Sequence, residues 1–475
     1  MDLSWTLEAC GPAAAQRCDL HSMSRSQNNR NVQRSMSLLP EAIRSKLASS
    51  DIANRFVKLV SWTMIAFALD KAAALILVFL LARILGAADY GRLTLAQGLV
   101  NTAQIFVVLG AGPMLARYIP AMRQENLRRA VEVINLCSIV VVGASVAFTI
   151  TSLLGAPYIA RIVLNLSPTS NLPYLMMMWV LLTAANGLLL TIMLSFEKGR
   201  IMGLVSLITS LMSIAAVPTF ALNAGLPGAM ATLVVVEVAK VLLLLRLYIK
   251  FLNEHNVSIF TPARRDDMPL LWQFGLPVFL NTALWAPTIW LAQFIVKTHA
   301  PDGLVAVGVF GFANNLLGAV ILFSGLTNRA ALPIQSSLHA QGAHQDLRRV
   351  SRLLALGQIG AAAIIALPTA VLAPFIMAAA GDEFVSYWPV LIVMISVGVI
   401  LAGQNALYNY LLVKQGPTFA LITLVPWAAI MIGAAVIYAA HGPYALAWGL
   451  FVASIVRTGL FLWAWQRSHD PKPSL

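Results

Sequence analysis

Charged residues lie inside long apolar segments of this sequence, where charge is costly. Asp70 and Lys71 are adjacent within the apolar run 66–85. Each ionised side chain at the centre of a membrane helix costs about 2.5–3.5 kcal/mol on insertion scales. Adjacent helical residues point about 100° apart, so either both border a wet cavity or a neighbouring helix holds one of them. Lys71 is a candidate for binding an anionic group, and Asp70 for carrying an ion or positioning Lys71. A purely structural pair is the alternative.

Two further intramembrane positions carry charge. Glu237 and Lys240 are three residues apart, which places them on one helix face where they can pair. Arg457 has no acid three residues before it, so it is the less neutralised cation and a candidate for anion binding. Arg83 and Arg117 end apolar segments and are weaker candidates, because both could instead extend to lipid headgroups.

The overall composition indicates the kind of environment in which these charged residues lie. Of 475 residues, 59% are hydrophobic and 11% charged, with mean hydropathy +0.79, whereas soluble domains carry roughly 25% charged residues. Apolar runs of twenty or more residues predict helices rather than barrel strands. The chain is therefore expected to be an all-α integral membrane protein. Its net charge of +13 then reports membrane topology rather than nucleic-acid binding.

The hydropathy pattern predicts twelve transmembrane helices. Their expected bounds are 57–84, 90–115, 129–154, 171–196, 201–223, 226–250, 268–297, 304–329, 350–378, 385–413, 417–440 and 443–466. This gives an N-terminal tail (1–56), a first six-helix bundle (57–250), a linker (251–267), a second bundle (268–466) and a C-terminal tail (467–475). Lys and Arg concentrate on the side of the two tails, so both termini and the linker are expected to be cytoplasmic.

The two halves show a weak internal repeat. The segment Gly91–Ala96 resembles Gly308–Ala313, which lies 217 residues later. Gly225 precedes Lys240 by fifteen residues, as Gly442 precedes Arg457. Because six spans return the chain to its starting side, the repeat would be parallel and related by an axis along the membrane normal. Two such bundles would enclose a central cavity.

Two motifs resemble those of a known family. The stretch "LARILGAADYGRLTLAQGLVN" (Leu81–Asn101) and the stretch "LGAGPMLARYIP" (Leu109–Pro120) are similar to motifs of the polysaccharide transporter family, which contains the O-antigen and exopolysaccharide flippases. The resemblance implies two bundles in a V that open alternately to either face of the bacterial inner membrane. It also implies movement of a lipid-linked oligosaccharide, on a polyprenyl diphosphate, from the inner to the outer leaflet. Membrane lipids, a glycan polymerase and chain-length proteins would be its partners.

Other functions remain open at this stage. A multidrug or toxin exporter would favour an acidic cavity, whereas Asp70 and Glu237 lie beside lysines. A membrane glycan polymerase or ligase would need a sizeable catalytic outer loop, and the outer loops here are short. We therefore expect no enzyme activity, cofactor or metal. The amides of the second half, among them Gln404 and Asn405, could bind sugar hydroxyls or link helices.

Overall fold

The computed structural model describes residues 51–196, 198–259, 261–262, 279, 283–415 and 417–467, and their regular structure is helical. Two compact units separate between Ile65 and Ala66. Only residues 51–65 of the first unit are described, as the beginning of helix α3. The second unit extends from Ala66 to the C-terminus and contains the rest of α3 and all the other described helices.

Two very long helices are each interrupted by a left-handed glycine. Helix α3 (Asp51–Val108) contains Gly86 with φ of 72°, and α7 (Gly199–Glu254) contains Gly225 with φ of 60°. The apolar parts of these helices are 40 and 54 residues long. At 1.5 Å per residue they would span about 60 and 80 Å, far more than the ~30 Å bilayer core. Each therefore comprises two successive spans that meet at a glycine, and Gly86 lies between the expected spans 57–84 and 90–115. The second of these is divided in the structure, because α3 ends at Val108 and a new helix begins at Ala111.

The remaining helices of the first half are shorter. They are α4 (Ala111–Glu125), α5 (Leu127–Tyr158) with a π-helical end (Ile159–Val163), and α6 (Leu172–Ser195). The Asn126 side chain caps α5 by accepting a hydrogen bond from the backbone N–H of Arg129 at 3.3 Å, which satisfies one of the free donors of the first turn. Helix α6 packs against both α4 and α7.

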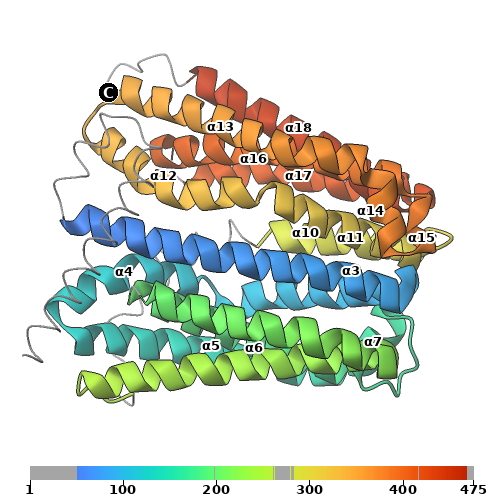
Figure 1. Ribbon diagram of the computed structural model, residues 1–475, viewed down its shortest axis with the longest axis horizontal. Helices are drawn as coiled ribbons and strands as arrows, with labels where there is room; N and C mark the ends of the chain where they lie inside the picture. The colour runs from blue at the N-terminus through green and yellow to red at the C-terminus, as the bar shows by residue number, and fades with distance from the viewer. Residues whose placement is uncertain are drawn as a thin grey trace, which may run out of the picture. The chain divides into compact units, whose positions relative to one another are not determined.

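The second half contains more breaks than the sequence predicts. Its elements are α10 (Trp285–His299), α11 (Gly303–Val320), α12 (Leu322–Ala340), α13 (His344–Val371), α14 (Ala373–Ala380), α15 (Asp382–Val385), α16 (Trp388–Gln415), α17 (Pro417–Ile437), a 3-10 turn (Ala439–His441) and α18 (Pro443–Arg467). The expected spans 304–329 and 350–378 are divided near Ile321 and Leu372. Helix α16 packs against α11, α12, α13 and α18 (Figure 1).

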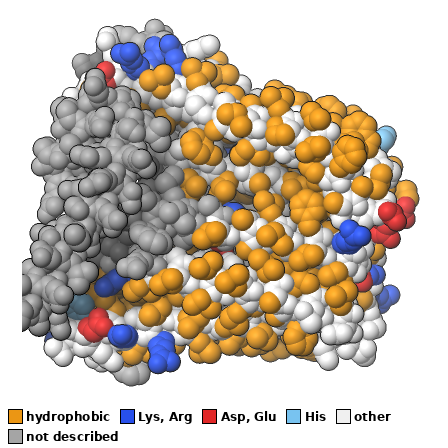
Figure 2. Space-filling view, viewed as in Figure 1, with side chains coloured by type: hydrophobic (Ala, Val, Ile, Leu, Met, Phe, Trp, Pro, Cys, Tyr) orange, Lys and Arg blue, Asp and Glu red, His pale blue; other side chains and the backbone are white. Residues whose placement is uncertain are grey.

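The surface of the described helices is that of a membrane protein. Eight helices are long and apolar enough to cross a bilayer, counting only the described residues. Large apolar side chains such as Leu154 and Ile364 are more than 70% exposed. Hydrophobic side chains cover most of the described part of the face in Figure 2, and charged side chains gather near its ends. The exact count of twelve spans in two bundles stays a prediction, because the start of the expected span 268–297 lies outside the described residues.

The backbone supports the internal repeat. Gly225 and Gly442, separated by the same offset of 217 residues, both adopt positive φ, at 60° and 61°. Gly91 of α3 and Gly308 of α11 face one another so closely that an added Cβ at Gly91 would lie 2.0 Å from the carbonyl oxygen of Leu304. An added Cβ at Gly308 would lie 2.1 Å from the carbonyl oxygen of Ala87. Equivalent residues of the two halves therefore make reciprocal contacts.

Candidate functional site

Asp70 is held by a neighbouring helix segment. Its Oδ1 accepts hydrogen bonds from the hydroxyls of Ser206 at 3.1 Å and Ser210 at 3.2 Å. The two serines are four residues apart on α7, so they lie on one face of the helix. This arrangement matches one of the two placements expected for the adjacent charges. The sequence analysis did not identify Ser206 and Ser210, although their spacing continues to Ser213 as a polar stripe in an otherwise apolar span.

Lys71 lies apart from this contact. Its side chain is exposed and forms no hydrogen bond or ion pair with the residues that the structure describes. Asp70 and Lys71 therefore do not neutralise each other directly. Lys71 remains available to an anionic group, as the candidate assignment requires.

Glu237 and Lys240 form the pair that their spacing predicts. The Nζ of Lys240 lies 3.4 Å from Oε1 of Glu237, and the two side chains are 21% and 17% exposed. The second carboxylate oxygen of Glu237 accepts a hydrogen bond from the amide of Asn186 on α6 at 2.9 Å. Asn186 was missed at the sequence level because nothing in its local pattern points to a residue fifty positions away.

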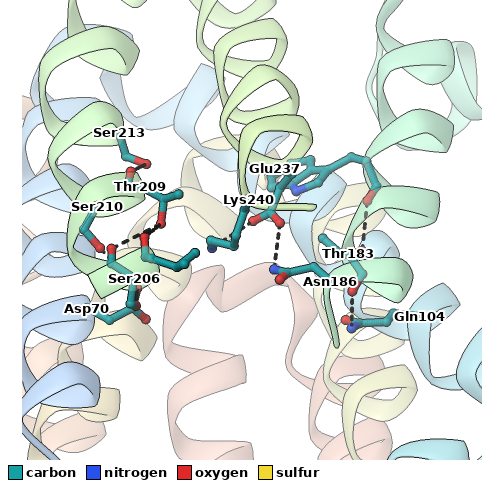
Figure 3. A network of polar contacts seen from close by, with 12 residues as sticks. Asp70, Gln104, Thr183, Asn186, Ser206, Thr209, Ser210, Ser213, Glu237 and Lys240 are labelled. Carbon is teal, nitrogen blue, oxygen red and sulfur yellow. Dashed lines mark hydrogen bonds and ion pairs between the residues drawn. The ribbon is translucent and has the colours of Figure 1, made fainter. Parts of the chain in front are cut away.

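The two acids belong to one polar region inside the first half of the chain. Figure 3 shows Asp70 with its serines on one side and Glu237 with Lys240 and Asn186 on the other. Nearby, the amide of Gln104 donates to the carbonyl of Thr183 at 3.1 Å, which links α3 to α6. Chemically, the region holds two partly buried carboxylates that accept hydrogen bonds from neutral donors, and one ammonium group. Such groups can accept a proton or a small cation without disrupting an apolar core.

Arg457 occupies a different environment in the second half. It is only 8% exposed and its Nε has no hydrogen-bond partner among the described residues. Its guanidinium carbon lies 5.2 Å from the ring centre of Phe461 and 5.9 Å from that of Trp285. Trp285 in turn stacks on Trp427 with ring centres 4.2 Å apart. The cation is therefore stabilised by aromatic faces rather than by a carboxylate, at least within the part of the chain that the structure describes.

Of the two arginines expected at span ends, Arg83 lies at such an end, just before Gly86, whereas Arg117 lies within α4 and does not end a helix. Arg83 is exposed near Gly86, at the turn within α3. Arg117 lies on α4, but its side chain is outside the described part of the structure. Neither is brought together with the polar region around Asp70 and Glu237 by any described contact.

Amides of the second half link helices to one another. Asn405 donates to the hydroxyl of Ser324 at 3.0 Å, and Gln404 donates to that of Thr458 at 3.1 Å. Asn315 donates to the Tyr90 hydroxyl of the first half at 3.2 Å. These contacts favour the interhelical role over sugar binding for these side chains. Among the described residues, no group of three or more His, Cys, Asp or Glu could hold a metal ion.

The two halves meet around the Gly91–Gly308 crossing. The carboxylate of Glu383 accepts a hydrogen bond from the backbone N–H of Ala87 at 2.7 Å, directly after the Gly86 turn. The indole N–H of Trp290 donates to the carbonyl of Leu95 at 3.2 Å. This end of the molecule is therefore closed by direct contacts between the halves.

Apolar spans, an internal repeat and partly buried ionisable groups together define a multi-pass helical membrane protein. The sequence model of a family described as polysaccharide biosynthesis protein matches residues 56–339. The chain belongs to this family. The comparison with curated proteins found no match.

Several solved structures have a similar fold. The chain is similar to the inward-facing conformation of a multidrug resistance MATE family transporter of the MOP superfamily, with TM-score 0.70 and 14% identity over 85% of this chain and 98% of the other. It is similar to an outward-facing MATE transporter of that superfamily, with TM-score 0.63 and 16% identity over 89% and 97%. A mutant of a Vibrio cholerae MATE transporter matches with TM-score 0.57 and 13% identity over 90% and 98%. At these identities the comparison establishes the fold.

Proposed function

We propose that this protein is a flippase that moves a lipid-linked oligosaccharide, on a polyprenyl diphosphate, from the inner to the outer leaflet of the bacterial inner membrane. The observation that carries the proposal is the match to the polysaccharide biosynthesis family over most of the first half and part of the second. The product would supply a glycan polymerase and chain-length proteins for surface polysaccharide export. Both termini would be cytoplasmic.

Two basic side chains without an acidic partner among the described residues suit an anionic substrate. Lys71 carries an uncancelled charge next to Asp70, and Arg457 has aromatic rings rather than acids around it. A diphosphate needs cations that are not already neutralised. We assign the diphosphate to Lys71, with Arg457 as a second anion contact and Lys240, Arg83 and Arg117 as weaker candidates.

Asp70 and Glu237 would couple transport to a proton or sodium gradient. Both are partly buried carboxylates within spans, and both accept hydrogen bonds that orient an oxygen. The double variant Asp70→Asn, Glu237→Gln should lose gradient-driven transport in vesicles while still inserting in the membrane. Unchanged gradient dependence in this variant would remove the coupling assignment.

The alternative function is multidrug or toxin extrusion, which the shared fold accommodates. A cationic drug would be attracted by unpaired acids. Glu237 is paired with Lys240, which favours the glycan substrate, whereas Asp70 is bonded only to serine hydroxyls among the described residues and is the acid that a cationic drug could use.

The decisive experiment compares the two substrates in one preparation. Proteoliposomes containing the purified chain would receive a fluorescent polyprenyl diphosphate oligosaccharide, and an impermeant quencher would report its transfer between leaflets. Transfer above that of protein-free vesicles is the expected result. Absence of transfer, combined with gradient-driven efflux of a cationic drug, would replace the proposal with the alternative.

A further inference from the structure

A groove in the second half combines apolar walls with two unpaired arginines. It has a volume of about 540 Å³ and lies between α13, α16 and α18. Its lining includes Arg348 and Arg352 at one end, and Ile359, Val399 and Ile400 further along. No Asp or Glu is among the lining residues. The groove is separate from Asp70, Glu237 and Arg457, which do not line it.

The arginines of this groove are incompletely satisfied. The Nε of Arg348 is buried and has no hydrogen-bond partner within the described residues. The guanidinium carbon of Arg348 lies 6.0 Å from the ring centre of Trp465, which fixes its position at the mouth. Arg352 follows one helical turn later and is exposed. In the described part of the chain neither arginine forms an ion pair, although Asp346 lies two residues before Arg348. The two arginines at this end of the groove therefore have no anionic partner within the described residues.

The rest of the groove suits a hydrocarbon chain. Leu356, Ile359 and Leu462 line it and remain 61%, 39% and 45% exposed, so they face whatever fills the groove or the lipid beside it. Gly403 keeps the floor open, since an added Cβ there would lie 2.7 Å from Cδ1 of Ile359. The polar lining residues at depth, Gln404 and Thr458, are already bonded to each other. The deeper part of the groove therefore gives no reason to expect a polar ligand there.

A second groove lacks this combination of apolar walls and basic side chains. The cavity of about 740 Å³ between α17 and α18 is larger, yet no Lys or Arg lines it. Lipid chains could cover either surface, but only the groove at Arg348 offers basic groups at the end of an apolar channel. Basic pockets between transmembrane helices recognise anionic lipid headgroups in this way.

We propose that the groove between α13, α16 and α18 binds an anionic membrane phospholipid, with its phosphate at Arg348 and Arg352 and an acyl chain along Ile359 and Val399. The lipid bridges three helices of the second half. It occupies a place apart from the transported substrate. The positive-inside pattern of this segment puts the headgroup in the cytoplasmic leaflet.

The test measures lipid binding by the purified full-length chain, without any transport step. Delipidated protein would be titrated with cardiolipin, phosphatidylglycerol or phosphatidylcholine, and bound lipid counted by native mass spectrometry. The double variant Arg348→Gln, Arg352→Gln should bind the two anionic lipids about thirtyfold more weakly, since two basic groups next to a phosphate are lost. Arg349→Gln is the matched control: Arg349 is exposed on the same helix but does not line the groove. It should bind as the unmodified protein does.

Two further arms identify the occupant. Ala355→Trp fills the channel and leaves both arginines in place, so it should also weaken binding of the phospholipid. Binding that is unaffected by this change would mean that only the phosphate is recognised, and it would overturn the proposal. Undecaprenyl phosphate competing with cardiolipin at equal or lower concentration would overturn it too, in favour of the carrier lipid. Equal anionic-lipid binding by the double variant and the Arg349→Gln control would show that the groove binds no headgroup.

Discussion

The close contact of Gly91 on α3 with Gly308 on α11 leads to a quantitative prediction about the contact between the two halves. In Gly91→Ala, the new Cβ would lie 2.0 Å from the carbonyl oxygen of Leu304 if nothing moved. Carbon–oxygen contacts between helices are normally about 3.3 Å or longer, so the two backbones must separate by roughly 1.3 Å. Overpacking of this kind costs about 1–3 kcal/mol. The closed arrangement of this end should therefore lose roughly 5- to 150-fold in population.

The assay follows the accessibility of the crossing directly. In a background without native cysteines, Thr94→Cys would place a thiol beside Gly311, whose added Cβ would meet Thr94 at 2.4 Å. Reaction of this thiol with a maleimide should accelerate in Gly91→Ala, and substrate transfer should fall.

The control for this experiment is a glycine with free space around it. Gly143→Ala adds the same methyl group on α5, where nothing lies within 4 Å, and it should leave both measurements unchanged. Gly308→Ala should reproduce the effect of Gly91→Ala. The free-energy cost of the Gly91→Ala, Gly308→Ala double variant should be smaller than the sum of the costs of the two single variants, because both changes separate the same two backbones. Thiol reactivity and transfer equal to those of the unmodified protein would refute the reasoning.

Substitutions at three basic residues give three further predictions. Lys71→Ala should impair translocation of the lipid-linked glycan while the protein still inserts and purifies; normal transfer would make Lys71 irrelevant to the substrate. Lys240→Ala should lower the denaturation midpoint by an amount equivalent to about 1 kcal/mol, and adding Glu237→Gln should restore most of it because no unpaired carboxylate remains. A double variant less stable than the single one would contradict that account. Arg457→Gln should raise the KM for the lipid substrate several-fold, with partial recovery in Arg457→Lys, measured in the quencher assay; identical KM values in all three proteins would exclude Arg457 from binding.

Local features of this chain could be read from the sequence, and long-range ones could not. Apolar run length indicated where the helices lie, because the bilayer fixes the length of a span. The pairing of Glu237 with Lys240 follows from their spacing on one helix. The hydroxyls that hold Asp70 and the rings around Arg457 come from other helices, and no local pattern specifies which helices meet.

Breaks within spans were likewise not predicted, although Pro374 at the start of α14 is a signal for the one at Leu372. The expected span 350–378 is divided at Leu372, whose backbone N–H bonds to the carbonyl of Pro368 as α13 ends. The division near Ile321 lies in an apolar stretch without proline or charge. Hydropathy averages over such a break, because a short irregular turn inside a protein leaves the apolar composition unchanged.

The reciprocal contact of Gly91 and Gly308 has a consequence for the origin of the chain. If the two halves descend from one duplicated segment, a half-length ancestor would have assembled as a two-fold symmetric dimer. In a symmetric dimer, one surface meets its own copy, so a single glycine would have touched its counterpart on the axis. One mutation of this glycine to any larger residue would then have placed two larger side chains in the interface, one from each copy. After fusion the halves could diverge in charge, as Glu237 and its equivalent Ser454 have, while both copies of this glycine remained under the same spatial demand.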